Sequence, residues 1–160
     1  LLIRAFAQAF SSNPDCTLRI VGEGPERPRL EKLIENLQLT KRITLTGQLG
    51  RSEVFEELAN AHAFALATQF ETFGVAVLEA LATGLPVVTT LSGGPESIVT
   101  EDDGLLVPLN KVSAFSDALA RCASPNVHWD RAAISKRAFS RFGPASIAER
   151  LSTIYREVII

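Results

Sequence analysis

Apolar side chains recur along this chain with two alternating spacings, one typical of helices and one typical of buried strands. Near the start, Ile3, Phe6, Ala7 and Phe10 follow the i, i+3, i+4, i+7 spacing of an amphipathic helix. Residues 17–21 form a short apolar-rich run between turn-forming residues, which indicates a strand. The alternation continues with helices expected around 30–37, 52–61 and 74–83, and with strands at 43–46, 63–67, 85–90 and 105–107.

After residue 107 the strand signals stop and three helical patterns follow, over 112–122, 134–142 and 144–158. No linker or repeat interrupts the chain, so residues 1–160 are expected to form a single domain. Strands that alternate with helices predict an α/β fold, Rossmann-like, with a parallel sheet covered by helices on both faces. In such folds ligands bind outside the carboxyl ends of the strands, here the loops after 21, 46, 67 and 90.

The composition narrows the class of partner. The chain has 160 residues, 46% of them hydrophobic, and a net charge of -2, which gives no general attraction to nucleic acid or to anionic lipid. No apolar run approaches the roughly 20 residues of a membrane span. Two cysteines and two histidines are too few and too scattered for a disulfide framework or a metal site, so we expect no metal and a reduced, cytoplasmic setting. The absence of methionine predicts that the sequence is a piece of a longer protein.

A glycine-rich turn follows the first predicted strand, with Gly22 and Gly24 separated by one residue. A dinucleotide-binding fingerprint would need a third glycine where Arg27 stands, which disfavours a dehydrogenase. The glycines still allow a ligand to approach the backbone closely, and an ordinary strand-to-helix turn is an equally good interpretation.

The segment 69–84 carries two acids, Glu71 before the predicted helix and Glu79 inside it. Eight residues of helix rise about 12 Å, so the acids are expected to hold separate parts of an extended ligand and not to share a proton. Between them, free amides near Phe73, Gly74 and Val75 form a helix N-terminus suited to phosphate. With Glu79 directed inward, this set suits a nucleotide-sugar; alternatively Glu71 only caps the helix and Glu79 reaches solvent.

The same segment resembles the donor-binding signature of the group 1 glycosyltransferases (glycosyltransferase family 4). The resemblance lies in Glu71-Thr-Phe-Gly, in Glu79, and in Ala80-Leu-Ala-Thr-Gly-Leu-Pro-Val-Val. Further blocks in family order are Leu18-Arg-Ile-Val-Gly-Glu-Gly-Pro, Arg42-Ile-Thr-Leu-Thr-Gly, Ser92-Gly-Gly-Pro-Glu-Ser-Ile-Val and Asp103-Gly-Leu-Leu-Val-Pro. The resemblance implies the C-terminal half of a two-domain GT-B enzyme, without the first strand of that half.

The resemblance also implies a role for each matching position. Glu71 is the implied catalytic residue, which contacts hydroxyls of the donor sugar, and Glu79 is implied to bind the ribose hydroxyls. The amides of 73–75 would meet the sugar and the phosphates, and 43–47 would flank the base. The remaining implied donor-binding positions are Gly22, Gly24, Ile43, Gly47, Thr68, Gly93 and Gly94; Thr68 keeps a hydroxyl where the family has serine.

The implied function is transfer of a sugar, with retention, from a UDP- or GDP-sugar to an acceptor in polysaccharide or glycolipid synthesis. The acceptor-binding N-terminal domain and the Arg and Lys that neutralise the diphosphate would lie upstream of Leu1, so the chain alone is expected to be inactive. Membrane contact would occur only through that missing domain. Two rival functions stay open: a sugar-nucleotide epimerase of the same architecture, and a non-catalytic nucleotide-binding module.

Two charged stretches are expected to be exposed to solvent and not to bind a ligand. Glu101, Asp102 and Asp103 precede a glycine and are expected to form a solvated loop. The basic residues Arg131, Lys136, Arg137 and Arg141 lack interleaved aromatic side chains, so a solvated helix face is favoured over a nucleic-acid site.

Overall fold

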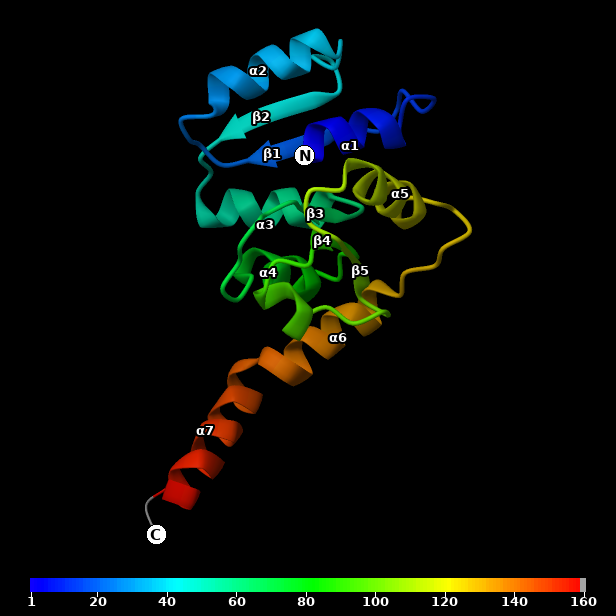
Figure 1. The fold of residues 1–160 in the computed structure, drawn as a ribbon. Coiled ribbons are helices and arrows are strands. Elements are labelled where there is room, and N and C mark those ends of the chain that lie inside the picture. The colour runs from blue at the N-terminus through cyan, green and yellow to red at the C-terminus, as the bar shows by residue number, and fades with distance from the viewer. Residues whose placement is uncertain (159–160) are drawn as a thin grey trace.

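The computed structural model describes residues 1–158, and Figure 1 shows their arrangement. The helices are α1 (Leu2–Ala9), α2 (Arg27–Asn36), α3 (Arg51–Asn60), α4 (Val75–Ala82), α5 (Val112–Cys122), α6 (Arg131–Phe142) and α7 (Pro144–Val158). The strands are β1 (Leu18–Val21), β2 (Ile43–Gly47), β3 (Phe64–Leu66), β4 (Val87–Thr90) and β5 (Gly104–Val107), with a short 3-10 helix η1 (Gly94–Ser97) between β4 and β5. Each lies where the hydrophobic spacing predicts it, within a few residues.

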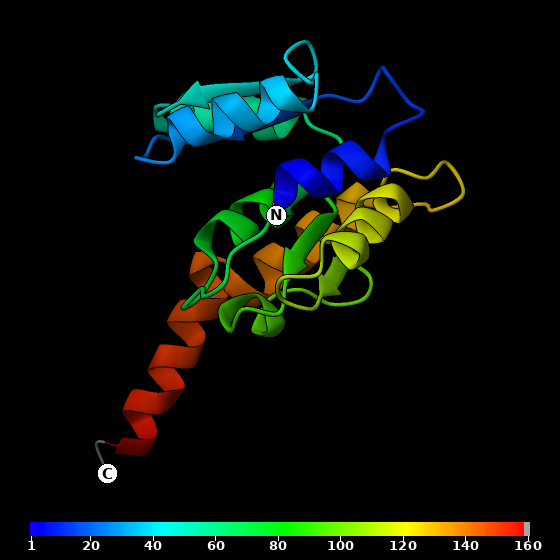
Figure 2. The ribbon, with the colours of Figure 1, turned by 45° about the horizontal axis from the view of Figure 1, so that its top comes forward.

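All strand pairs are parallel, as predicted, but the strands form two sheets. β1 pairs with β2, and β3, β4 and β5 pair in that order with β4 in the middle. Figure 2 shows the two-stranded sheet with α2 as a separate layer above the rest. Within residues 1–158 no strand joins the two sheets. The strands are parallel, as predicted, but they do not form the single continuous sheet that was expected.

The core is divided between the two faces of the three-stranded sheet. Adjacent residues of β4 point to opposite faces because side chains alternate along a strand. Val88 packs in a cluster with residues of α1 and α5, including Phe6 and Phe115. Val87 packs in a second cluster with residues of α4 and α6, including Leu81 and Ile134. Helices therefore cover both faces of this sheet, as the fold class predicts.

The helix expected over 52–61 begins slightly earlier, at Arg51, as α3. The N-cap is Gly50, whose amide donates to Oε2 of Glu53 at 2.7 Å. The side chain of Glu53 therefore satisfies an amide that would otherwise lack a partner at the helix start. The helix begins one residue before Ser52, which is exposed.

Both charged stretches that were expected to be solvated are tethered to the body of the protein. Asp103 is buried, and its Oδ1 accepts from Nε of Arg137 at 2.7 Å. Its Oδ2 accepts from Oγ1 of Thr100 at 2.6 Å. Arg131 donates to the carbonyl group of Ala61, directly after α3. Arg141 donates to the carbonyl groups of Ser97 and Ile98 at the end of η1. The prediction of a solvated loop is wrong for Asp103, because partners distant in sequence complete its hydrogen bonds.

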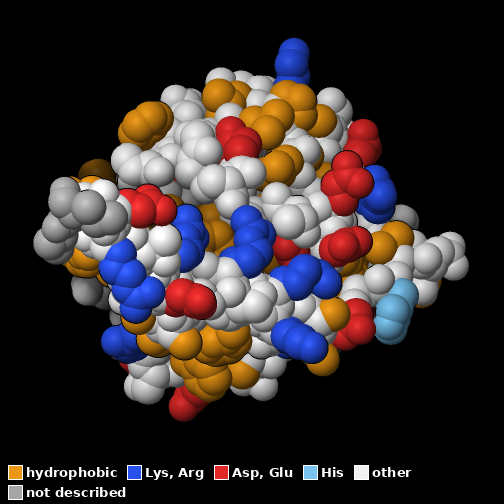
Figure 3. Space-filling view, turned by 90° about the horizontal axis from the view of Figure 1, so that it is seen from below, with side chains coloured by type: hydrophobic (Ala, Val, Ile, Leu, Met, Phe, Trp, Pro, Cys, Tyr) orange, Lys and Arg blue, Asp and Glu red, His pale blue; other side chains and the backbone are white. Residues whose placement is uncertain are grey.

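Figure 3 views the face from which α7 protrudes, and Lys and Arg side chains gather across its centre. Of the four basic residues of α6, three hydrogen-bond to groups outside this helix, namely Arg131, Arg137 and Arg141.

The two cysteines are both free, and we expect them to differ in reactivity. Burial raises the pKa of the Cys122 thiol to about 11, because the charged thiolate loses its solvation. The thiolate is the reactive form, so iodoacetamide at pH 8 should modify Cys16 and leave Cys122 unmodified in the folded protein. Mass spectrometry of the peptides after timed labelling measures this. Equal labelling of both cysteines would contradict it, and labelling in denaturant is the control.

Candidate functional site

The loop between β3 and α4 folds back so that Glu71 bonds to the start of the helix. Its Oε1 accepts from the amides of Phe73 and Gly74, at 3.4 and 3.1 Å. The amides predicted to be free for phosphate are therefore occupied in part by this carboxylate, which is an anion at a helix N-terminus. Oε2 of Glu71 accepts no hydrogen bond from residues 1–158, so one oxygen stays available to a ligand hydroxyl.

The loop after β4 lies directly against the Glu71 segment. The amide of Glu71 donates to the Ser92 carbonyl at 2.9 Å, and the amide of Gly94 donates to the Glu71 carbonyl at 2.7 Å. Glu71 and Gly93 form a parallel bridge that extends the pairing beyond β3 and β4. A Cβ on Gly94 would lie 2.3 Å from the carbonyl oxygen of Phe73, so only glycine allows this approach.

Thr68 also joins these two loops. Its Oγ1 lies 3.1 Å from Oγ of Ser92, and its carbonyl accepts from Oγ1 of Thr90 at 2.6 Å. The structure therefore brings together Thr68, Glu71, Gly93 and Gly94 at the carboxyl ends of β3 and β4. Parallel α/β sheets place ligands at this end. Ser92 belongs to this cluster through its hydroxyl and its carbonyl.

Glu79 is exposed on α4, and the expectation that it points inward is wrong. The residues of α4 that pack into the core are Val77, Ala80 and Leu81, so Glu79 faces away from them. Its carboxylate forms no ion pair and no hydrogen bond with the side chains or backbone of residues 1–158. A carboxylate in this state can accept from ligand hydroxyls without breaking a bond inside the protein.

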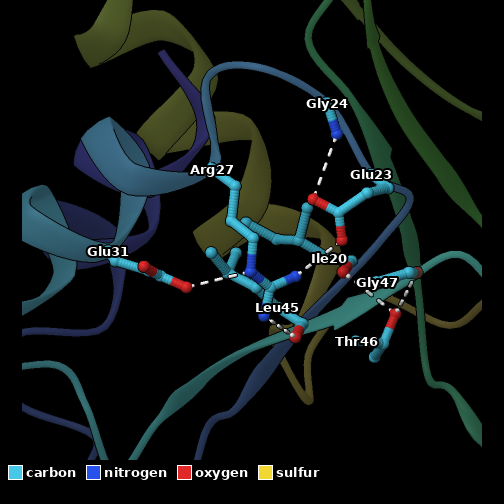
Figure 4. Close-up of polar contacts among 8 residues, drawn as sticks. All are labelled: Ile20, Glu23, Gly24, Arg27, Glu31, Leu45, Thr46 and Gly47. Carbon is cyan, nitrogen blue, oxygen red and sulfur yellow. Dashed lines mark hydrogen bonds and ion pairs between the residues drawn. The ribbon is translucent and has the colours of Figure 1, made fainter.

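A second group of predicted residues meets at the carboxyl ends of β1 and β2. The amide of Gly22 donates to the Gly47 carbonyl at 2.9 Å. Gly47 has a φ of 76°, and a Cβ there would lie 3.3 Å from Oε2 of Glu23. Figure 4 shows Arg27 held between Glu23 and Glu31, with a further bond to the Leu45 carbonyl. Because two carboxylates neutralise this guanidinium, it is not a free cation for a phosphate.

Gly24 and Ile43 were both expected to contact the donor, but they differ in exposure. Gly24 is exposed, and its amide donates to Oε1 of Glu23 at 3.3 Å (Figure 4). Ile43 is only 5% exposed and pairs with Leu18 at the opposite end of the strand from Gly47. Its side chain belongs to the core, so including it among the ligand-contacting residues is wrong.

A hollow of about 740 Å³ lies beside the Glu71 segment. Phe73 forms one wall, and side chains of η1, α6 and α7 form the rest, among them Ser97, Arg141 and Leu151. Neither Glu71 nor Glu79 lines this hollow.

Within the described part of the chain, no group of three His, Cys, Asp or Glu side chains is arranged to hold a metal ion. In the same residues, no helix has both the length and the apolar content to span a bilayer.

This arrangement of parallel strands covered by helices, with acids and glycine turns at the carboxyl ends of the strands, is that of an α/β domain of the doubly wound type. The family model described as "Glycosyl transferases group 1" matches residues 1–141. The chain belongs to this family, as the sequence resemblance implies, and its fold is that of the C-terminal half of GT-B glycosyltransferases.

Three similar proteins illustrate the relationship. N-acetyl-alpha-D-glucosaminyl L-malate synthase of Bacillus anthracis is 29% identical over 99% of this chain and 42% of its own length. Sucrose-phosphate synthase from Thermosynechococcus elongatus is 28% identical with a TM-score of 0.80, over 98% of this chain and 42% of that one. The pneumococcal O-GlcNAc transferase, solved with UDP and GlcNAc, is 22% identical with a TM-score of 0.80, over 97% and 32%. The chain thus spans less than half the length of these proteins.

Proposed function

We propose that this chain binds the nucleotide-sugar donor of a retaining glycosyltransferase, with UDP as the nucleotide. The observation that carries the proposal is the pair of acids around the start of α4. Glu71 keeps one carboxylate oxygen without a protein partner, and Glu79 is exposed and unpaired within residues 1–158. Such acceptors suit ligand hydroxyl groups, because a charge-assisted hydrogen bond is stronger than a neutral one.

In this proposal the sugar hydroxyls donate to Glu71 and the ribose hydroxyls donate to Glu79. The diphosphate lies near the Val75 amide at the start of α4, because Glu71 already occupies the amides of Phe73 and Gly74. The partial positive charge of the helix start favours an anion there. The base lies near the turns at Gly22 and Gly47. UDP is chosen because the pneumococcal relative was solved with it.

We further propose that the chain binds the donor without transferring its sugar. The acceptor-binding domain and the cations that neutralise the diphosphate would be supplied by a longer protein, which would use no metal. There, catalysis would consist of holding the donor in position and stabilising the charge of the leaving diphosphate. Synthesis of a cell-surface polysaccharide or glycolipid, in the cytoplasm, stays a prediction for that protein.

The proposal is tested by titrating the isotope-labelled chain with UDP, GDP and ADP to millimolar concentration and recording amide chemical shifts. We expect UDP to shift the amides of Gly47, Gly74 and Val75. Glu79→Gln should weaken UDP binding by about ten- to a hundredfold, because it removes a charge-assisted hydrogen bond. Circular dichroism checks that the variant is folded.

Glu56→Gln is the matched control, since Glu56 is likewise exposed on a helix but lies on α3. Its affinity for UDP should equal that of the unchanged chain. If none of the three nucleotides binds, the proposed function is refuted for this chain. An unchanged affinity in Glu79→Gln would refute the role given to Glu79.

A further inference from the structure

The C-terminal end of α6 contacts η1, the short helix that follows Gly93. Arg141 donates from Nη1 to the Ile98 carbonyl and from Nη2 to the Ser97 carbonyl, each at 2.7 Å. Both carbonyl groups lie at the end of η1, where backbone acceptors lack partners within the helix. A single guanidinium therefore satisfies two acceptors with its fixed fork of donors.

The same guanidinium also lies over an aromatic ring that reaches the Glu71 segment. The Cζ atom of Arg141 is 4.8 Å from the ring centre of Phe142. The Phe142 ring meets the Phe73 ring edge to face, with the centres 6.1 Å apart and an angle of 78° between the planes. Such pairs favour one relative orientation of the rings. Phe73 is thereby fixed from α6, two residues after Glu71.

η1 and the Glu71 segment are in turn joined to each other by backbone bonds. The Gly94 amide donates to the Glu71 carbonyl, and the backbones of Gly94 and Phe73 are in close contact. The segment 71–73 is thus held by η1 through backbone contacts and by Phe142 through the ring of Phe73. Arg141 is in direct contact with both the end of η1 and the ring of Phe142.

We propose that Arg141 is a positioning residue that holds Glu71 in place to receive the donor sugar. This inference rests on the proposed function, and it adds a residue far in sequence from the acids. Arg141 touches no part of the proposed ligand site itself. It acts through η1 and Phe142, so its loss should disturb binding of the sugar more than binding of the nucleotide.

The first measurement is backbone amide hydrogen exchange in Arg141→Met, which keeps an apolar stem and removes the guanidinium. We expect the Glu71 and Gly94 amides to exchange at least about tenfold faster, because local opening of this segment becomes easier. The Leu91 amide, bonded to the Val107 carbonyl, should be unchanged. Arg131→Met is the matched control, since Arg131 bonds the Ala61 carbonyl at the other end of α6.

The second measurement compares the affinities for UDP and UDP-glucose. In Arg141→Met the affinity for UDP-glucose should fall about tenfold while that for UDP changes less than about twofold. Arg131→Met should change neither affinity. Arg141→Lys restores the charge but cannot bond both carbonyl groups, so it should recover the binding of UDP-glucose only in part.

These results distinguish a positioning role of Arg141 from a general contribution of Arg141 to the stability of the fold. Equal acceleration of exchange at Leu91, Glu71 and Gly94 would overturn the inference, because Arg141 would then act on the whole fold. Unchanged exchange at Glu71 and Gly94 would overturn it as well. If the unchanged chain binds neither UDP nor UDP-glucose, the proposed function fails, and the exchange data alone still show whether Arg141 holds the segment.

Discussion

Replacing Gly94 with alanine is expected to abolish UDP-glucose binding and to lower the free energy of unfolding by about 3 kcal/mol. The added Cβ would lie 2.3 Å from the Phe73 carbonyl oxygen and 2.4 Å from its carbonyl carbon. These are backbone atoms, so no side chain can rotate away to make room. η1 and the Glu71 segment must separate, which breaks the bond from the Gly94 amide to the Glu71 carbonyl.

Denaturant unfolding and isothermal titration calorimetry with UDP-glucose measure these two effects. Gly24→Ala is the matched control, because a Cβ on Gly24 meets no atom within 4 Å. That variant should retain the stability of the unchanged chain. A Gly94→Ala chain with unchanged stability and affinity would show that the two loops need not lie in contact.

Asp103→Asn is expected to lower the free energy of unfolding by about 2 to 3 kcal/mol and the melting temperature by about 5 to 10 °C. Asp103 is 2% exposed and bonds both Arg137 and Thr100. The variant removes the charge of the carboxylate and leaves Arg137 without its ionic partner, although the Asp102 carbonyl still accepts from Arg137. Arg137 is 32% exposed, so water partly compensates and the loss is smaller than for a fully buried pair.

Differential scanning calorimetry measures the change in melting temperature. Asp102→Asn is the control, because the Asp102 side chain is exposed and only its carbonyl accepts from Arg137. Its melting temperature should equal that of the unchanged chain. Equal melting temperatures for the Asp103 variant and the control would contradict the assignment of this ion pair as a tether between α6 and the loop before β5.

The order and type of the elements could be predicted because each depends on residues close in sequence. The apolar spacing of Ile3 and Phe6 defines the buried face of α1, and Phe10, directly after the helix, packs against the same cluster. Turn residues such as Gly22 and Gly93 mark where strands end. The family signature likewise consists of short blocks, so it identified the family without any knowledge of contacts.

Errors arose where a neighbour distant in sequence decides the environment of a side chain. Ile43 is in the segment expected to flank the base, yet its position at the start of β2 places it in the core. Asp103 has a loop-like sequence around it, and Arg137 lies 34 residues away. Glu79 has apolar neighbours in sequence, but the face of α4 that packs was not predictable from them, since α4 is apolar almost all round.

The sequence by itself determined the helices and strands, the parallel direction of pairing, the family and the two acids, because periodicity and motif act over a few residues. Only the tertiary structure decided that Glu71 bonds the amides at the start of α4, that Gly94 must be glycine, and that Arg141 joins α6 to η1. Arg141 lies 43 residues from Ile98 along the chain, and only packing of the helices against the sheet brings them together.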